Sequence, residues 1–291
     1  KARMMMMFIT IKGAFSDTVS VPEPGVDRME MQERETNASA VACQGLPPDP
    51  GLNSVGAGGP GSAAGHPCSH GWPRVSCLVC AGRENAADDG KGITKEIAEE
   101  FFLLGIDVIT SGNHIWDKKD TTDFIEKEKR LLRPANLVDG SPGRGFEIYW
   151  SKNKKYKIGV INLMGNVFMK KTEDVFKISK KIFKNIVLKK NVDFSVVDFH
   201  GEITSEKMAI AHYLDGCSTC VVGTHTHVPT ADTRILEKGT AYQTDIGMCG
   251  DYNSVIGMNK ENSIKRFLKD KDATSHFPSE GEATLSGIIV E

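Results

Sequence analysis

Residues 220–227 read Cys-Val-Val-Gly-Thr-His-Thr-His, a short apolar run that ends directly in side chains able to bind metals. A run of this kind is typical of a buried strand. Similar runs occur at 107–110, 157–163, 194–199 and 241–244. Between the runs, residues 95–104, 174–188 and 205–214 have apolar side chains at helical spacing. Strands that alternate with helices favour an α/β layered sheet over an all-β sandwich.

The composition narrows the class of protein. The chain has 291 residues, 40% of them hydrophobic, which is enough for a sizeable core. Its 36 Lys and Arg residues nearly balance its 38 Asp and Glu residues, so no overall field attracts nucleic acid or acidic lipid. The apolar run 4–9 is far too short to span a bilayer. We therefore expect a cytoplasmic protein with no membrane partner and no sequence-specific nucleic acid.

The N-terminal part differs from the rest of the chain. Residues 23–74 are rich in Pro, Gly, Ser and Ala, and such a composition buries too little apolar surface to offset its ordering entropy. Residues 8–11 could form one short strand before this stretch. We predict an atypical segment over residues 1–75, largely of low complexity or disordered, and a folded domain over residues 76–291.

Polar clusters follow four of the apolar runs, where the strands are predicted to end. The candidate side chains are Glu84, Asn85, Asn113, His114, His200, His225 and His227. Ligands of open α/β sheets bind beyond the carboxyl ends of the strands, so these clusters can converge. Imidazole, carboxylate and amide groups together suit divalent iron, manganese or zinc. His225 and His227 alternate along a segment expected to be extended, which would point both rings to one face.

Each candidate also has an ordinary structural explanation. Glu84-Asn85 could be a simple turn, and Asn113-His114 could cap a helix over residues 116–124. His212 on a helix and His276 in a polar loop are expected to have no function. The pairs Cys77/Cys80 and Cys217/Cys220 have the spacing of zinc ligands, but they adjoin apolar runs and are better explained as structural thiols. Seven cysteines, an odd number, also argue against a secreted disulfide scaffold.

At these clusters the chain resembles the YmdB-like calcineurin-type metallophosphoesterases over most of residues 82–291. The shared motifs are Glu84-Asn85-Ala86-Ala87, Gly90-Lys91-Gly92-Ile93-Thr94, Ser111-Gly112-Asn113-His114-Ile115-Trp116-Asp117, Arg133-Pro134-Ala135-Asn136, Asp198-Phe199-His200, Thr204-Ser205-Glu206-Lys207, Val222-Gly223-Thr224-His225-Thr226-His227 and Thr244-Asp245-Ile246-Gly247-Met248. A set this long and this ordered is far more specific than any single dipeptide.

The resemblance implies an α/β sandwich of two mixed β-sheets flanked by helices. It also implies two divalent metal ions, iron or manganese, bridged by Glu84. The other implied metal ligands are Asn85, Asn113, His200, His225 and His227. His114 resembles the proton donor of the family, and Arg133 and Asn136 could contact the phosphate or shape the pocket. The implied reaction is hydrolysis of a small phosphodiester such as a 2′,3′-cyclic nucleotide.

One departure from the family pattern leaves an alternative open. The first strand of the family ends in Gly-Asp, and the aspartate is a metal ligand, whereas Gly13 is followed here by Ala14. A catalytically impaired pseudoenzyme that binds a metal or nucleotide is therefore the rival hypothesis. A third hypothesis, a nucleic-acid-binding module built on Cys68, His70, Cys77 and Cys80, is disfavoured by the near-neutral charge. The sequence leaves a homo-oligomer open.

Overall fold

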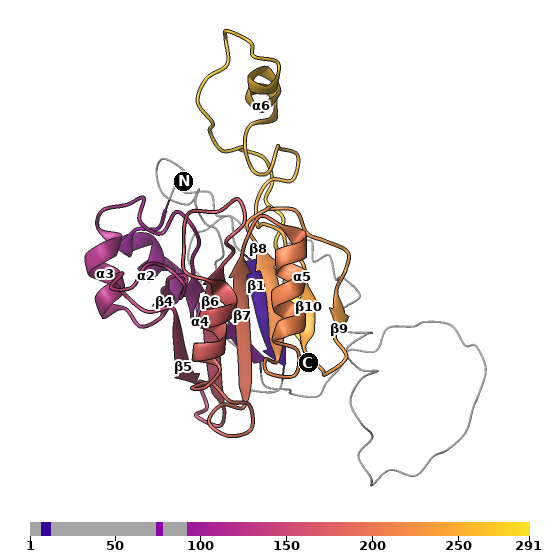
Figure 1. Ribbon diagram of the computed structural model, residues 1–291. Helices are drawn as coiled ribbons and strands as arrows, with labels where there is room; N and C mark the ends of the chain where they lie inside the picture. Colours follow the sequence, from indigo (N-terminus) through magenta and orange to yellow (C-terminus); the bar gives the residue numbers. More distant parts are fainter. Residues whose placement is uncertain (1–6, 13–73, 78–91) are drawn as a thin grey trace, which may run out of the picture.

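The computed structural model describes residues 7–12, 74–77 and 92–291, and describes side chains within the last range (Figure 1). The helices are α2 (Lys95–Leu103), α3 (Thr121–Lys127), α4 (Val175–Ile182), α5 (Thr204–Tyr213) and α6 (Lys260–Phe267). The strands are β1 (Met7–Lys12), β2 (Arg74–Cys77), β3 (Ile109–Thr110), β4 (Leu131–Leu132), β5 (Phe146–Trp150), β6 (Lys157–Met164), β7 (Phe194–His200), β8 (Cys220–Thr224), β9 (Arg234–Ile235), β10 (Ala241–Gln243) and β11 (Ser286–Val290).

The larger sheet has six strands in the order β5-β6-β7-β8-β10-β9. Its four central strands are parallel, and an antiparallel strand borders each side. β6 and β7 are buried along almost their whole length, which explains why their sequences are continuous apolar runs rather than alternating ones. The alternating α/β order predicted from the sequence is confirmed.

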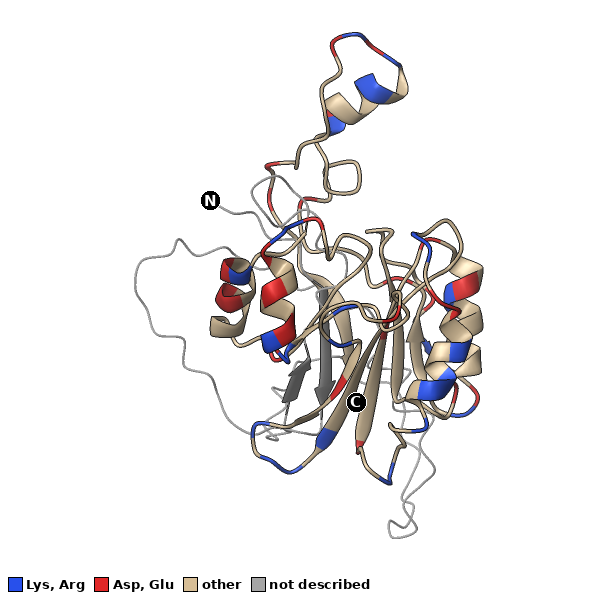
Figure 2. Cartoon of the chain, turned by 60° about the vertical axis from the view of Figure 1, so that its left-hand side comes forward, with Lys and Arg blue, Asp and Glu red and all other residues tan. Residues whose placement is uncertain are grey.

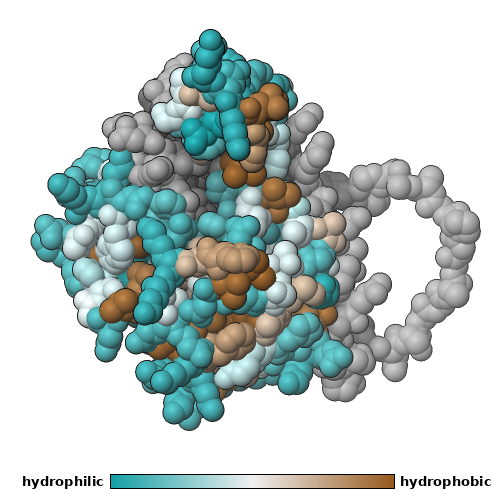
Figure 3. All heavy atoms as spheres, turned by 45° about the horizontal axis from the view of Figure 1, so that its top comes forward, coloured by the Kyte–Doolittle hydropathy of each residue, from teal (hydrophilic) through white to brown (hydrophobic). Residues whose placement is uncertain are grey.

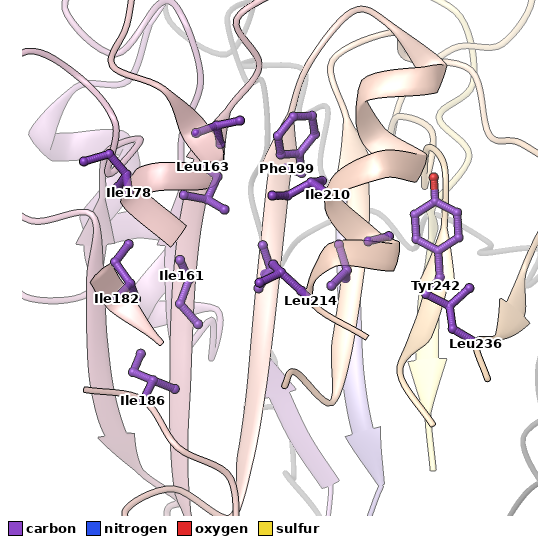
Figure 4. Packing of buried hydrophobic residues seen from close by; sticks show 14 of the residues in the cluster. Ile161, Leu163, Ile178, Ile182, Ile186, Phe199, Ile210, Leu214, Leu236 and Tyr242 are labelled. Atoms are coloured by element: carbon purple, nitrogen blue, oxygen red, sulfur yellow. The ribbon is translucent and has the colours of Figure 1, made fainter. Parts of the chain in front are cut away.

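Helices α4 and α5 cover one face of this sheet (Figure 4). The Asp174 side chain accepts a hydrogen bond from the Lys177 amide and so caps the first turn of α4. Val175, Ile178 and Ile182 then lie on one side of this helix at helical spacing and pack against the sheet. Figure 4 shows Ile178 and Ile182 of this helix beside Ile161 and Leu163 of β6.

The other face of the large sheet packs against the smaller sheet, whose order is β11-β1-β2. β1 pairs in parallel with β11 and antiparallel with β2, so this sheet is also mixed. Ile288 and Val290 of β11 join a core cluster with Val196 and Val222 of the large sheet. The predicted sandwich of two mixed sheets is therefore confirmed. The expected first strand is observed as β1, inside the predicted segment 1–75, and the proposed domain boundary stays a prediction.

A smaller layer stands beside the sandwich, where α2 and α3 pack around the two-stranded sheet β3-β4. α6 belongs to a segment that extends away from the body at the top of Figure 1. Charged residues lie mainly on the helices and loops (Figure 2), and hydrophilic residues cover most of the face in Figure 3. Among the described residues, no helix is long and apolar enough to cross a membrane.

Two helix boundaries differ from the sequence prediction. The helix expected over 116–124 begins at Thr121, because residues 112–117 form tight turns in which Ile115 donates to Gly112 and Asp117 donates to His114. The helix expected over 174–188 ends at Ile182. Beyond that point the Asn191 side chain forms hydrogen bonds with backbone groups: it accepts from the Val187 amide and donates to the Asn185 carbonyl.

Candidate active site

The candidate site lies where β7 and β8 end beside the loop that follows β3. His200 is the last residue of β7 and is paired in register with Thr224, the last residue of β8. Parallel strands end at one edge of a sheet, so the histidines that follow them share that edge. Asn113 reaches the same place from the loop after β3, and its side-chain Oδ1 lies 2.7 Å from Nε2 of His200.

His200 is enclosed on all sides and is fully buried. Nδ1 of His225 lies 3.0 Å from Nε2 of His200, and the two rings meet edge to face. A Cβ atom at Gly112 would lie only 2.3 Å from the His200 ring. Glycine at this position therefore leaves the space that the imidazole occupies.

The neighbours of His200 and His225 show how each ring could present a lone pair to a metal ion. The Thr224 hydroxyl donates to the Asp198 carboxylate over 2.8 Å, and its oxygen lies 3.3 Å from Nδ1 of His200. An oxygen already donating its own proton can accept from Nδ1 of His200, while Nε2 of the same ring faces the acceptor Oδ1 of Asn113 over 2.7 Å. With a metal ion bound, the ring proton would lie on Nδ1, and Nε2 would present its lone pair. Nε2 of His225 faces the Glu202 carboxylate at 3.1 Å, which leaves the His225 lone pair on Nδ1. In a metal-bound site, both rings would therefore present lone pairs from the nitrogens that meet there.

A hydrogen bond also orients the His227 ring, although the backbone there differs from the sequence prediction. Nδ1 of His227 donates to the Ile256 carbonyl over 2.8 Å, so Nε2 carries the lone pair, as in histidines that bind metals. The segment is not extended, because φ is +101° at His225 and +66° at His227. The expected alternation along a strand is therefore wrong: β8 ends at Thr224, and both histidines lie in a turn.

His114 lies beside the same loop and is paired with a carboxylate. Its Nδ1 contacts Oδ2 of Asp117, so the carboxylate holds the ring with Nε2 as the atom that can exchange a proton with other groups. Lys170 reaches this loop from the segment between β6 and α4. Its ammonium group donates to the Asn113 carbonyl over 2.7 Å and lies 3.7 Å from Asp117.

The donor atoms fit a divalent metal ion. Two nitrogens at about 2.1 Å from one ion and at a right angle to each other would be about 3.0 Å apart, as the nitrogens of His200 and His225 are. In the part of the chain that the structure describes, no group of three or more His, Cys, Asp or Glu side chains is placed to hold a metal ion. The cluster there has two imidazoles and one amide. Glu84 and Asn85, the remaining predicted ligands, lie outside the described residues.

Arg133 and Asn136 are committed to internal hydrogen bonds. The Arg133 guanidinium donates to four backbone carbonyls, those of Pro134, Ala135, Ser141 and Pro142. Asn136 is fully buried and both donates to and accepts from the backbone of Met164. These contacts give both residues a structural role, and their contact with substrate stays a prediction.

Sequence reasoning gave no role to the groups that support the histidines, although Asp198, Lys207 and Asp245 lie in the shared motifs. Asp198 is fully buried, and burial raises its pKa to about 7 while the Thr224 hydroxyl works against that rise. Lys207 and Asp245 form a buried ion pair beneath the histidine turn. A charged side chain inside an apolar run, as in Val197-Asp198-Phe199, was a further signal beside those motifs. Of the second cysteine pair, Cys220 is buried with its pKa raised to about 12, and Cys217 is exposed.

Two mixed sheets packed face to face, with histidines at the carboxyl ends of parallel strands, define a metallophosphoesterase-like fold. The family model described as YmdB-like protein matches residues 74–291, and the chain belongs to that family. The chain is 45% identical over 208 residues to the 2′,3′-cyclic-nucleotide 2′-phosphodiesterase of Bacillus subtilis, covering 72% of this chain and 76% of that relative.

Two solved structures are similar to this chain. One is a novel phosphatase from Mycoplasma pneumoniae, 37% identical with a TM-score of 0.62, covering 71% of this chain and 73% of that one. The other is a hypothetical protein from Thermus thermophilus, 36% identical with a TM-score of 0.62, covering 70% of this chain and 78% of that one. The predictions of the family, the fold and a hydrolase are confirmed by these matches.

Proposed function

We propose that the chain is a divalent-metal-dependent phosphodiesterase that hydrolyses cyclic nucleotides such as 2′,3′-cyclic AMP. The observation that carries this proposal is the convergence of three ligand-type atoms, Asn113 Oδ1, His200 Nε2 and His225 Nδ1, at the edge of the sheet. The named activity of the Bacillus subtilis relative supports the choice of substrate. A cytoplasmic location and a small-molecule partner belong to the same proposal.

Two ions, iron or manganese, would be held by Asn113, His200, His225 and His227, together with Glu84 and Asn85. When bound, such ions supply Lewis-acid polarisation of a phosphoryl oxygen and activate water. The protein's part is to present the lone pairs. Thr224, Glu202 and the Ile256 carbonyl each lie against the opposite ring nitrogen of one histidine, and would hold it in the tautomer that a metal requires.

His114 would act as the general acid. Asp117 contacts Nδ1, which stabilises the protonated ring and holds its orientation. Nε2 would then give its proton to the oxygen that leaves phosphorus, and so prevent the build-up of an alkoxide. Lys170 holds the backbone of the neighbouring Asn113 and so keeps the loop in place.

The rival function is a catalytically impaired protein that binds a metal or nucleotide and regulates a partner. The observation that favours it is Ala14, which stands after Gly13 where the family pattern has an aspartate ligand. A missing carboxylate would weaken one ion without removing the other. Metal stoichiometry and turnover separate the two functions.

The test is hydrolysis of 2′,3′-cyclic AMP by the purified full chain with manganese or iron, together with metal counting. His114→Ala should lower kcat by about 10²- to 10⁴-fold and leave the metal content unchanged. His200→Ala should lower the metal content itself. His212→Ala is the matched control, because His212 is exposed near the end of α5, and it should change neither quantity.

Each other outcome has a definite meaning. Full turnover in His114→Ala would contradict its role as the proton donor. No turnover in the unaltered chain, with one metal or none bound, would contradict the enzyme and favour the regulatory protein.

A further inference from the structure

A buried ion pair lies beneath the histidine turn and has no part in the proposed ligand set. Nζ of Lys207, on α5, lies 2.7 Å from Oδ2 of Asp245, and each side chain is 1% exposed. The lysine stem passes close to β8, where a Cβ atom at Gly223 would lie 2.7 Å from its Cδ. Removing two charges from water costs free energy of folding unless the other donors and acceptors of the pair also form hydrogen bonds.

The Asp245 carboxylate accepts three further hydrogen bonds, two of them from the histidine turn. Oδ2 accepts from the Thr226 amide over 3.1 Å and from the Thr226 hydroxyl over 2.7 Å. Oδ1 accepts from the Gly247 amide over 2.9 Å. One carboxylate therefore binds both the backbone and the side chain of the residue between His225 and His227.

The turn needs such an anchor because its backbone is unfavourable. His225 and His227 have φ values of +101° and +66°, a region that side chains other than glycine seldom occupy. Conformations of this kind persist only where the surrounding structure holds them, and they gather at functional sites. Thr226, between these two residues, is one point at which the surrounding structure holds the turn, beside the bond from His227 to the Ile256 carbonyl.

We propose that Lys207 and Asp245 are positioning residues that clamp the turn 225–227 and so place both histidines in the site. Asp245 holds the turn through Thr226, and Lys207 donates from α5 to the same carboxylate oxygen over 2.7 Å. The link to metal binding rests on the proposed function, whereas the clamp on the turn does not.

Hydrogen exchange of the full-length protein without added metal tests the clamp directly. In Asp245→Asn, amides of residues 225–227 should exchange about 10- to 100-fold faster, because the bonds from Thr226 lose a charged acceptor. Thr226→Val should give about a 10-fold increase and leaves the ion pair intact. Asp215→Asn is the matched control, since Asp215 is buried and accepts two backbone amides before β8, at the opposite end of that strand.

Manganese titration of the same variants tests the link to the site. Asp245→Asn and Thr226→Val should bind Mn²⁺ about 10- to 100-fold more weakly, and Asp215→Asn should bind it as the unaltered chain does. If Asp245→Asn does not fold, Thr226→Val decides both measurements. Unchanged exchange of the turn in a folded variant would overturn the clamp, whatever the turnover. Faster exchange in a chain that hydrolyses nothing would keep the clamp and remove the proposed function.

Discussion

Replacing Gly112 with alanine should damage the site through a single methyl group. The new Cβ would lie 2.3 Å, 2.4 Å and 2.6 Å from three atoms of the His200 ring. Carbon atoms pack best at about 3.5–4.0 Å, so the ring or the loop must move by about 1 Å. Either movement takes the 2.7 Å contact between Asn113 and His200 out of hydrogen-bonding range. The φ of Gly112 lies outside the left-handed region, so the clash alone is responsible.

The expected cost is about 1–3 kcal/mol in the free energy of unfolding and about 100-fold in kcat. Initial rates of 2′,3′-cyclic AMP hydrolysis with manganese, together with urea unfolding, measure both. Gly159→Ala is the control, because its Cβ would meet Ile186 at 3.0 Å inside the core beside α4 and should affect stability without affecting kcat. A kcat for Gly112→Ala within about twofold of the unaltered chain would refute the placement of His200.

Three further predictions concern residues outside the metal ligands. Burial raises the pKa of Asp107 against the opposing effect of Lys152, so the contribution of this residue to the free energy of unfolding should fall as the pH rises above about 4. Urea unfolding of Asp107→Asn should therefore depend less on pH than that of the unaltered chain, and the same pH dependence in both would contradict this. Asn136→Ala should lose roughly 2–4 kcal/mol in urea unfolding, and a loss under roughly 0.5 would contradict its buried bonds. Arg133→Met should lower Tm and leave KM unchanged, whereas a raised KM at constant Tm would restore its predicted contact with substrate.

The central strands and the ligand-type residues could be predicted because the same physics determines both. Strands buried on two faces must be apolar throughout, as β6 and β7 are, and a polar residue that follows such a strand stands out. His200 and His225 were singled out in this way. The strand β5 was missed because it lies at the edge of the sheet with its residues half-buried, so no apolar run marks it.

α6 was missed for a related reason. Asn259 caps it by accepting from the Asn262 amide, which is a local signal that the sequence does contain. Its large apolar side chains, however, are exposed: Ile264 is 54% and Phe267 82% accessible. A helix that buries no apolar stripe in its own domain gives little of the periodicity on which the prediction depends.

The supporting groups of the site are hidden in the sequence by distance along the chain. Lys207 has the position of an ordinary lysine on the helix α5, and three strands separate it along the chain from its partner Asp245, so nothing local marks either as buried. Gly112 and Gly223 are equally hard to recognise in the sequence, because each contributes only the space that another group fills. The His200 ring fills the space at Gly112, and the Lys207 stem and the Thr244 carbonyl fill that at Gly223. A chain with every ligand but with alanine at these two positions would keep the composition of a metal site and lose its geometry. The chemistry of the site can therefore be predicted from the residues that bind, whereas its shape is set by residues that bind nothing.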